Sequence, residues 1–388
     1  MKILTIVALY KPAYKGGGPI KTVANMVETL SDQFQFKIIT SDRDFGDCKS
    51  FPQIKTNSWQ KIDNAEVYYA TPNNLSFFKL IKIIKNTQYD VLYLNSFFNY
   101  RFSISLVFAK WLNLIEKKPI IIAPRGEFST GALKIKSIKK EIYIKFSNFM
   151  GIYNKATWQA SSEYESRDID KVIGSATNDI VIAPNLLIVK KSPAIINKSN
   201  IRKNFIRVVF LSRISPKKNL NYLLVILKEV KSPINLSIYG PIEDKNFWIE
   251  CKKLIDQLPP NITAEHKGEL TPEEVPNAFM EHDVFFFPTR GENFGHVIFE
   301  ALAVGTCVVL SDQTPWQADK NHAVETIPLE NTDQWVAALE RWANYSNEEL
   351  KAQRETALQY AREYIANSPA VEQNRQLFQS ALKKQLQT

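Results

Sequence analysis

The sequence contains few cysteines, and they form no pattern. Of its 388 residues only Cys48, Cys251 and Cys307 are cysteine, and they are odd in number and far apart. This spacing excludes a disulfide framework and a zinc finger. Met1 leads directly into an apolar run at residues 3–9, which is too short for a signal peptide with its cleavage site. We therefore expect a protein of the reducing cytoplasm.

Long hydrophobic runs are missing as well. The longest apolar stretch, residues 97–114, is interrupted by Arg101 and Lys110. Because a spanning helix needs about 20 apolar residues, a membrane span is not expected. Hydrophobic residues make up 45% of the chain and charged residues 23%, which is ordinary for a globular protein. The length predicts about two domains.

The charge is unevenly distributed along the chain. Residues 1–200 carry a formal charge of +12, whereas residues 201–388 carry −3. Within the basic half, the segment from Lys134 to Lys145 has apolar residues near helical spacing with lysines between them. A basic amphipathic helix of this kind can lie on an anionic membrane surface, but it can equally be a solvated helix that keeps the domain soluble. No recognised nucleic-acid-binding motif accompanies it, so we expect no nucleic acid partner.

Short apolar runs typical of buried strands alternate with longer helical stretches. Such runs lie at residues 3–9, 36–40, 67–70, 91–95, 120–123, 157–160, 180–183, 208–211, 234–239, 262–266, 284–287 and 306–310. The alternation predicts two α/β domains, each with a parallel sheet. We place the first domain at residues 1–190, the second at 191–365, and a final helix at 366–388 that returns to the first domain. The boundary falls in residues 186–204, which are rich in Lys, Asn and Ser.

One helix of the second domain carries an acidic residue among apolar neighbours. The stretch at residues 295–305 is apolar on nearly every side, so it should be buried, yet it contains Glu300. A buried carboxylate needs a hydrogen-bonding partner, either the hydroxyl groups of a ligand or a neighbouring backbone group. Glu292 precedes it in a loop after the aromatic strand 284–287. The free N–H groups at the helix start could bind a diphosphate.

Two further loops have the composition of anion sites. Gly16, Gly17 and Gly18 follow the first strand and precede a helix, an arrangement that lets backbone N–H groups approach a phosphate. Arg213 and Lys218 follow the first strand of the second domain, where two cations suit a diphosphate. Each loop could also be an ordinary solvated surface loop.

Together these residues resemble the retaining glycosyltransferases of family 4, which have the GT-B fold of two Rossmann-like, doubly wound domains facing a central cleft. The matching motifs are the glycine loop, Arg213 and Lys218 in R-x4-K order, Gly240-Pro241, the block from Glu292 to Leu302, and residues 311–316. The last two resemble enzymes that build capsule, O-antigen (lipopolysaccharide) or exopolysaccharide chains. Residues 124–127 and 131–134 resemble the same subgroup.

The resemblance implies a role for each of these positions. Arg213 and Lys218 would neutralise the diphosphate of a UDP- or GDP-sugar, Glu292 would face the donor sugar, and Glu300 would bind the ribose hydroxyls. Backbone N–H groups of Asn293, Phe294 and Gly295 would hold sugar or phosphate, with Gly17 and Gly18 closing over the phosphates from the first domain. Lys217 could substitute for Lys218.

The resemblance also implies sugar transfer with retention and without a metal or other cofactor. Two cations and a helix terminus would stabilise the departing diphosphate, which itself would take the acceptor proton. Asp-x-Asp, often found in metal-dependent transferases, occurs at Asp42–Asp44 and Asp168–Asp170, about as often as chance allows. The acceptor would be a lipid-linked oligosaccharide at the inner face of the plasma membrane.

One departure from the family pattern concerns a histidine. Many relatives place one after the strand at 120–123, near the transferred sugar, whereas this chain has Pro124-Arg125-Gly126-Glu127. Arg125 or Glu127 could contact the donor or acceptor in its place, or the two could form a structural ion pair. The same fold could also serve as a non-catalytic membrane scaffold, a sugar-nucleotide epimerase or a phosphorylase. The nucleotide base, the sugar and the acceptor are not encoded in any of these motifs.

Overall fold

The chain forms two compact units. The structure is a computed structural model that describes residues 1–388 except 130–131, 134–136, 175–178, 189–204 and 387–388. Unit 1 consists of Met1–Ile188 and Pro369–Thr388, and unit 2 of Val189–Ser368. Most of the segment in which we placed the domain boundary lies outside the described residues, as do Lys134, Ile135 and Lys136 of the basic segment.

Unit 1 is built on an eight-stranded sheet with the order β3-β4-β2-β1-β5-β6-β7-β8. All neighbouring strands are parallel except β3, which pairs antiparallel with β4 at the edge. Strand β5 is buried at every position, as expected for a central parallel strand. The strands are β1 (Lys2–Val7), β2 (Gln35–Ser41), β3 (Trp59–Ile62), β4 (Ala65–Ala70), β5 (Val91–Asn95), β6 (Ile120–Ala123), β7 (Ala156–Ala160) and β8 (Ile180–Ile182).

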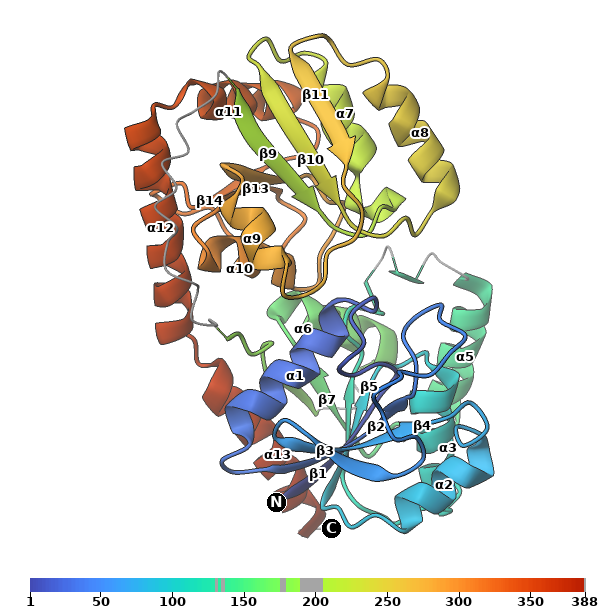
Figure 1. The fold of residues 1–388 in the computed structure, drawn as a ribbon. Helices are drawn as coiled ribbons and strands as arrows, with labels where there is room; N and C mark the ends of the chain where they lie inside the picture. The colour runs from blue at the N-terminus through green and yellow to red at the C-terminus, as the bar shows by residue number, and fades with distance from the viewer. Residues whose placement is uncertain (130–131, 134–136, 175–178, 189–204, 387–388) are drawn as a thin grey trace. The chain divides into compact units, whose positions relative to one another are not determined.

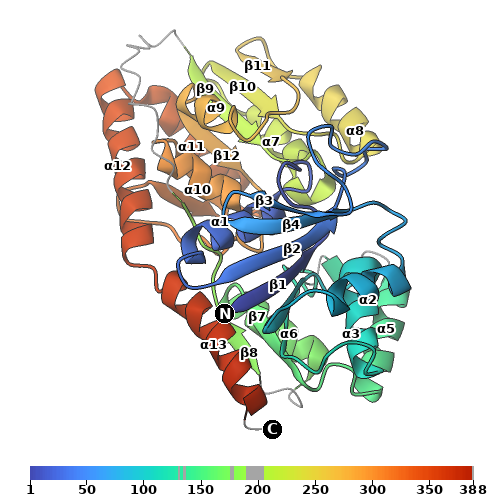
Figure 2. The ribbon, with the colours of Figure 1, turned by 60° about the horizontal axis from the view of Figure 1, so that its bottom comes forward.

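Helices cover both faces of this sheet (Figure 1, Figure 2). One core layer receives side chains from α2, α3, α5 and α6, and the other from α1 and the tail helix α13. Phe378 of α13 packs edge-on against Phe34, Phe36 and Tyr93, which attaches the tail to unit 1. The helices are α1 (Gly18–Leu30), α2 (Phe77–Lys85), η1 (Tyr100–Ile104), α3 (Ser105–Trp111), α5 (Ser137–Phe149), α6 (Glu163–Ile173) and α13 (Ala370–Leu386).

Unit 2 is built on a six-stranded parallel sheet with the order β11-β10-β9-β12-β13-β14. Helix α7 contacts α8 and α11, while α10 contacts α9 and α12 (Figure 1). The strands are β9 (Ile206–Leu211), β10 (Ile234–Tyr239), β11 (Ile262–His266), β12 (Val284–Phe287), β13 (Cys307–Ser311) and β14 (Val324–Ile327). The helices are η2 (Pro216–Lys218), α7 (Leu220–Leu227), α8 (Lys245–Ile255), α9 (Val275–Met280), α10 (His296–Ala303), α11 (Thr332–Asn344) and α12 (Asn347–Ala366).

Both sheets reverse their direction of growth beside their first strand. In unit 2 the chain moves outward from β9 to β11 and then returns to the other side of β9 with β12. In unit 1 the corresponding reversal lies between β1 and β5. At such a switch point the loops after the two strands diverge and leave a crevice at the carboxyl edge of the sheet, where ligands of open α/β sheets bind.

The predicted strands are confirmed, but two strands were missed. Strand β3 has only four residues and none is fully buried, while β14 is an edge strand with two partly exposed positions. Neither has the continuous apolar run that reveals a central strand. Among the described residues, the structure contains no helix with the length and apolar character that a membrane crossing requires.

Candidate functional site

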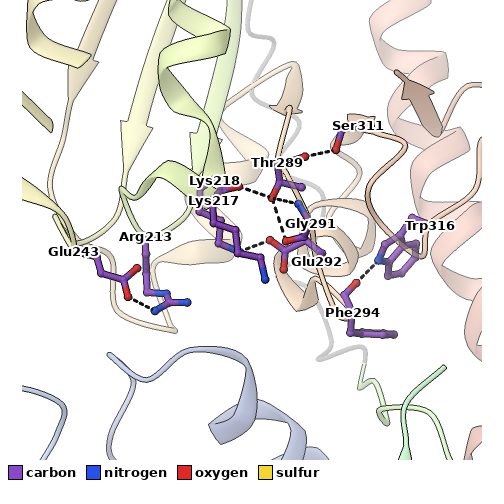
Figure 3. A network of polar contacts seen from close by, with 10 residues as sticks. All are labelled: Arg213, Lys217, Lys218, Glu243, Thr289, Gly291, Glu292, Phe294, Ser311 and Trp316. Carbon is purple, nitrogen blue, oxygen red and sulfur yellow. Dashed lines mark hydrogen bonds and ion pairs between the residues drawn. The ribbon is translucent and has the colours of Figure 1, made fainter. Parts of the chain in front are cut away.

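The loops after β9 and β12 bring together the predicted cations and Glu292. The two strands are neighbours, with Val284 of β12 opposite Val208 of β9. Lys218, the last residue of η2, forms an ion pair through Nζ with Oε1 of Glu292 (Figure 3). Both side chains are mostly enclosed, with 11% and 12% of their surface exposed. The switch point of unit 2 therefore holds a paired cation and carboxylate.

Backbone hydrogen bonds hold these two loops against each other. The Arg290 amide donates to the carbonyl of Lys217 at 2.8 Å, and the Thr289 hydroxyl donates to the same carbonyl at 3.2 Å. Asn219 adopts a left-handed conformation with φ of 62° and donates its side-chain amide to the Pro288 carbonyl at 2.9 Å. These bonds fix the position from which Lys217 and Lys218 extend (Figure 3).

Arg213 is also paired with an acid. Its Nη1 donates to Glu243 Oε1 at 2.7 Å, in a pair that is about half exposed. The approach of these loops depends on Gly240, which has φ of 131°, because a Cβ there would lie 2.0 Å from the carbonyl oxygen of Ser212. Only glycine adopts this conformation without strain, so the Gly240-Pro241 motif shapes the loop that carries Arg213.

Lys217 is the third cation of the cluster. The surrounding protein removes solvent from its ammonium group and so lowers its pKa, and Lys218 and Arg213 lower it further, whereas Glu292 raises it. Like charges that share a site disfavour each other's ionisation. The three cations of the cluster have only two carboxylate partners, Glu243 and Glu292, among the residues that the structure describes. The remaining positive charge favours the binding of an anion.

Helix α10 begins beside this cluster. Its N-cap, Gly295, has φ of 79° and provides no side-chain cap. The preceding loop is fixed by the Trp316 indole, which donates to the Phe294 carbonyl at 2.6 Å, and by the Glu292 amide, which donates to the Gln313 carbonyl at 3.0 Å. Asn293, Phe294 and Gly295 thus form a rigid entry to the helix.

Helix α10, which carries Glu300, is less completely buried than the sequence predicted. The sequence predicted a helix buried on every side, but only His296, Ile298, Phe299, Ala301 and Leu302 of α10 are buried. Val297 and Glu300, one turn apart, are only partly covered. The carboxylate oxygen Oε2 of Glu300 is nevertheless buried. A buried acceptor requires a hydrogen-bonding partner, and the expectation that the hydroxyl groups of a ligand bind Glu300 stays a prediction.

The glycine loop of unit 1 is held by an acidic residue. Gly17 is the N-cap of α1 with φ of 70°, and Gly18 is the first residue of that helix. The buried carboxylate of Asp44 accepts from the Tyr14 amide at 2.9 Å and from the Lys15 amide at 3.2 Å. Asp42 pairs with Arg43. Both aspartates of this Asp-x-Asp segment therefore have structural roles.

Arg125 and Glu127 do not form the ion pair that was the structural alternative. Glu127 accepts from the Phe97 amide at 2.5 Å, the Phe98 amide at 3.0 Å and the Ser96 hydroxyl at 2.8 Å, so its carboxylate caps the turn after β5. Arg125 instead contacts the neutral side chains of Asn95, Asn185 and Tyr93. Its environment is taken up again below.

Helix α5 exposes part of the basic amphipathic segment. Its inner side packs Tyr143 and Ile144 against the core of unit 1, together with the preceding Leu133. Apolar residues also lie on its outer side, where Ile138, Ile142, Phe146 and Phe149 are exposed, the last to 87%.

Some residues of the site could not be found by motif. Glu243 is a single acid in a loop, and Asp44 was noted only in a chance-level Asp-x-Asp match. Their hydrogen bonds alone reveal that they hold the loops of the site. No group of three or more His, Cys, Asp or Glu side chains suited to a metal ion occurs among the described residues. The expectation that no metal or other cofactor is needed stays a prediction.

Comparison with known proteins identifies the family. Residues 191–362, nearly all of unit 2, match the family model described as glycosyl transferases group 1. Unit 2 belongs to the group 1 glycosyl transferases. The predicted membership of glycosyltransferase family 4 is thereby confirmed. A protein of the cps region of Klebsiella pneumoniae, itself uncharacterized, is 26% identical over 244 residues, which are 61% of this chain and 64% of that protein. The chain thus spans less than two thirds of the length of that curated relative.

Solved structures match the whole fold. Anabaena Alr3699/HepE in complex with UDP and glucose has a TM-score of 0.69 at 16% identity, with 98% of this chain and 99% of that chain covered. The lipopolysaccharide outer core galactosyltransferase WaaB has a TM-score of 0.62 at 16% identity, with 98% and 99% covered. At this identity the likeness shows the fold of the chain and nothing more, and it confirms the predicted GT-B fold.

Proposed function

We propose that this chain transfers a sugar with retention from a UDP- or GDP-sugar to a glycan acceptor in the synthesis of a bacterial surface polysaccharide. One observation carries the proposal: Arg213, Lys217, Lys218 and Glu292 gather at the carboxyl edge of β9 and β12, next to the start of α10. A nucleoside diphosphate suits three cations and the N-terminus of a helix at a switch point. The cps-region relative and the WaaB structure support a role in surface polysaccharide synthesis.

In this mechanism the cations act on the leaving group. As the sugar–phosphate bond breaks, negative charge develops on the diphosphate, and Arg213 with Lys218 stabilises it from fixed positions. Glu292 would then accept hydrogen bonds from the donor sugar, and Glu300, partly exposed on α10, would accept them from the ribose hydroxyls. The N–H groups at residues 293–295 would bind sugar or phosphate. The roles of Gly17 and Gly18 stay predictions.

The first experiment measures nucleotide binding. The chain is heated with UDP, GDP or ADP, and a ligand at a hundredfold its dissociation constant should stabilise it by about 2.7 kcal/mol. The variant Lys218→Met should lose this stabilisation. The matched control Lys228→Met, a partly exposed lysine directly after α7, should retain it. If no nucleotide stabilises the wild-type chain, a non-catalytic scaffold becomes the better interpretation.

The second experiment measures transfer. Radiolabelled nucleotide sugars are incubated with the enzyme and bacterial membrane extract, and label in the lipid fraction is counted together with free UDP or GDP. A glycosyltransferase releases nucleotide only when a lipid-linked glycan is present. An epimerase would instead convert the sugar without an acceptor, and a phosphorylase would require inorganic phosphate.

We also propose that α5 places unit 1 on an anionic membrane. The exposed residues Ile138, Ile142, Phe146 and Phe149 recur at spacings of four, four and three, so they share one side of the helix. Lys139 and Lys145 are exposed on the same helix, although Lys145 also pairs with Glu141 at 2.7 Å. Insertion of the apolar side chains and attraction of lysine to anionic lipids add to each other.

Vesicle flotation tests this membrane contact. The chain should float with vesicles of phosphatidylglycerol and phosphatidylethanolamine, and less with phosphatidylcholine alone. The double variant Ile142→Ser with Phe149→Ser should remain at the bottom of the gradient. The control Ile249→Ser removes an apolar side chain exposed to 48% on α8 of unit 2 and should float normally. Equal flotation of all variants would leave α5 as a solvated helix.

A further inference from the structure

Arg125 is a charged residue held only by neutral groups. Its Nε donates to Asn95 Oδ1 at 3.1 Å, its Nη2 to the same oxygen at 2.8 Å and to the Tyr93 hydroxyl, and its Nη1 to Asn185 Oδ1 at 2.9 Å. Its guanidinium also lies over the Tyr93 ring at 5.9 Å. Within the described part of the chain, Arg125 has no carboxylate at ion-pair distance.

The surroundings of this guanidinium are buried and preformed. Asn95 and Asn185 are exposed to only 5% and 6%, while Arg125 itself remains partly exposed. The Tyr93 hydroxyl donates to Gln159 Oε1 at 2.5 Å, so its oxygen is oriented as the acceptor for Arg125. Neutral dipoles orient a cation without cancelling its charge, so the positive potential at the accessible side of Arg125 is retained.

The nearest carboxylates are occupied elsewhere. Glu127 caps the turn after β5 through three hydrogen bonds. Glu165 is buried and accepts from the Gly126 amide at 2.5 Å and from Ser161 through both its amide and its hydroxyl. By holding Gly126, Glu165 fixes the turn in which Arg125 has φ of 57°. A left-handed arginine is uncommon, and here the turn directs the side chain back over the sheet edge.

A second polar group at the same place is unsatisfied. The Nδ2 of Asn95 is buried and, among the described residues, has no hydrogen-bond partner. Its Oδ1 is fixed by two bonds from Arg125, so the amide cannot flip to use another acceptor without losing them. A buried N–H donor without an acceptor costs free energy. A ligand oxygen beside the guanidinium would accept this hydrogen bond and remove that cost. Asn95 ends β5, at the switch point of the unit 1 sheet.

We infer that Arg125 and Asn95 form an anion subsite in unit 1, and that the acceptor of the proposed transfer carries a phosphate or a carboxylate that binds there. This inference rests on the proposed glycosyl transfer for the identity of the acceptor, but not for the existence of the subsite. Two sources have this chemistry: the diphosphate of a lipid-linked acceptor, and the carboxylate of an acidic sugar. Arginine binds either group through parallel N–H donors.

Binding is measured with the donor site of unit 2 already filled. Isothermal titration is performed in excess UDP, first with farnesyl diphosphate and then with methyl glucuronide. The wild-type chain should bind one of them, which identifies the source, and Arg125→Met should weaken that binding at least tenfold. The control Arg167→Met removes an exposed arginine of α6 that lies over Tyr164, and it should bind as the wild type does.

A second variant, Asn95→Asp, tests the subsite even if Arg125→Met does not fold. Asn95→Asp retains both acceptor contacts with Arg125 and places a carboxylate beside the guanidinium, so the fold should be preserved or stabilised. It should nevertheless abolish anion binding, because the cation now has a counter-ion and the Nδ2 donor is gone. In transfer assays the same variant should raise the KM for acceptor while leaving the UDP-induced thermal shift unchanged.

The outcomes separate the subsite from the proposed function. If neither anion binds, or if Asn95→Asp binds it as tightly as the wild type, the subsite does not exist and Arg125 only ties the strands together. If both variants lose affinity for UDP instead of for the anion, Arg125 serves the donor and the inference is overturned. A chain that binds the anion through Arg125 but transfers no sugar refutes the proposed function and leaves the subsite standing.

Discussion

Removing the charge of Glu292 should tighten UDP binding while it prevents transfer. Glu292 holds Lys218 in an ion pair whose partners are about nine-tenths enclosed. If Lys218 binds the diphosphate, this pair must loosen as UDP enters, and its energy opposes binding. Glu292→Gln removes the ion pair that opposes binding. The affinity of the chain for UDP should therefore rise, even though the substitution lies within the nucleotide site.

The enclosure of the pair sets the size of the effect. Two unit charges about 3 Å apart attract by roughly 5 kcal/mol at an effective dielectric constant near 20. Desolvation of both groups offsets much of this, so a net coupling of about 1–2 kcal/mol is expected. The affinity for UDP should therefore rise roughly five- to thirtyfold, because about 1.4 kcal/mol corresponds to a factor of ten.

Titration calorimetry with UDP measures this change directly. The matched control is Glu325→Gln, which breaks the ion pair of Glu325 with Arg341 in the same unit and should leave the affinity unchanged. Glu243→Gln, which frees the half-exposed Arg213, should produce a smaller gain of about 0.5 kcal/mol. If Glu292→Gln binds UDP no better than the wild type, Lys218 does not exchange Glu292 for phosphate, and the reasoning fails.

Three further predictions concern the stability of the folded chain. Gly240→Ala should destabilise the chain by about 2 kcal/mol or more in denaturant unfolding, because its Cβ would meet the Ser212 carbonyl, whereas Gly174→Ala, with φ of 81° but open space, should cost about 1 kcal/mol. Burial, assisted by Lys155, lowers the pKa of Lys110 to about 8. The unfolded chain therefore binds more protons between about pH 8 and 10, and stability should rise with pH there relative to Lys110→Met. Ser346→Ala should cost about 1 kcal/mol without changing UDP affinity, because it removes the capping box of α12.

Sequence patterns revealed the elements that are buried and regular. The apolar runs at β5, β6, β10 and β12 predicted the observed bounds, because a central parallel strand is apolar on both faces. The box formed by Ser346 and Glu349 was also predicted, since its geometry is local. The hairpin of β3 and β4 was missed because its turn at Asp63 joins a short, half-exposed strand whose composition does not differ from a loop.

The sequence was sufficient to predict which residues form the site, but not which cation pairs with which carboxylate. Arg213, Lys218 and Glu292 follow neighbouring parallel strands, and the carboxyl ends of such strands meet at one edge. No pattern indicates that Glu243, thirty residues away, holds Arg213. From the sequence, Arg125 and Glu127 were equally good candidates for the contact to the donor or acceptor. Only the structure shows that the Glu127 carboxylate caps backbone amides, whereas the Arg125 guanidinium is held by neutral side chains.

The two acidic partners of the cations have a common physical consequence. Without a ligand, three clustered cations would repel one another. Burial is the main cause of the lowered pKa of Lys217, and the charges of Lys218 and Arg213 lower this pKa further. Glu292 and Glu243 each neutralise one cation and so keep the loops in place. A diphosphate that enters releases Glu292 at the moment when a donor sugar would offer it hydroxyl groups. Nucleotide without sugar leaves that carboxylate uncompensated, so the intact donor should bind more tightly than UDP alone, and this preference should disappear in Glu292→Gln.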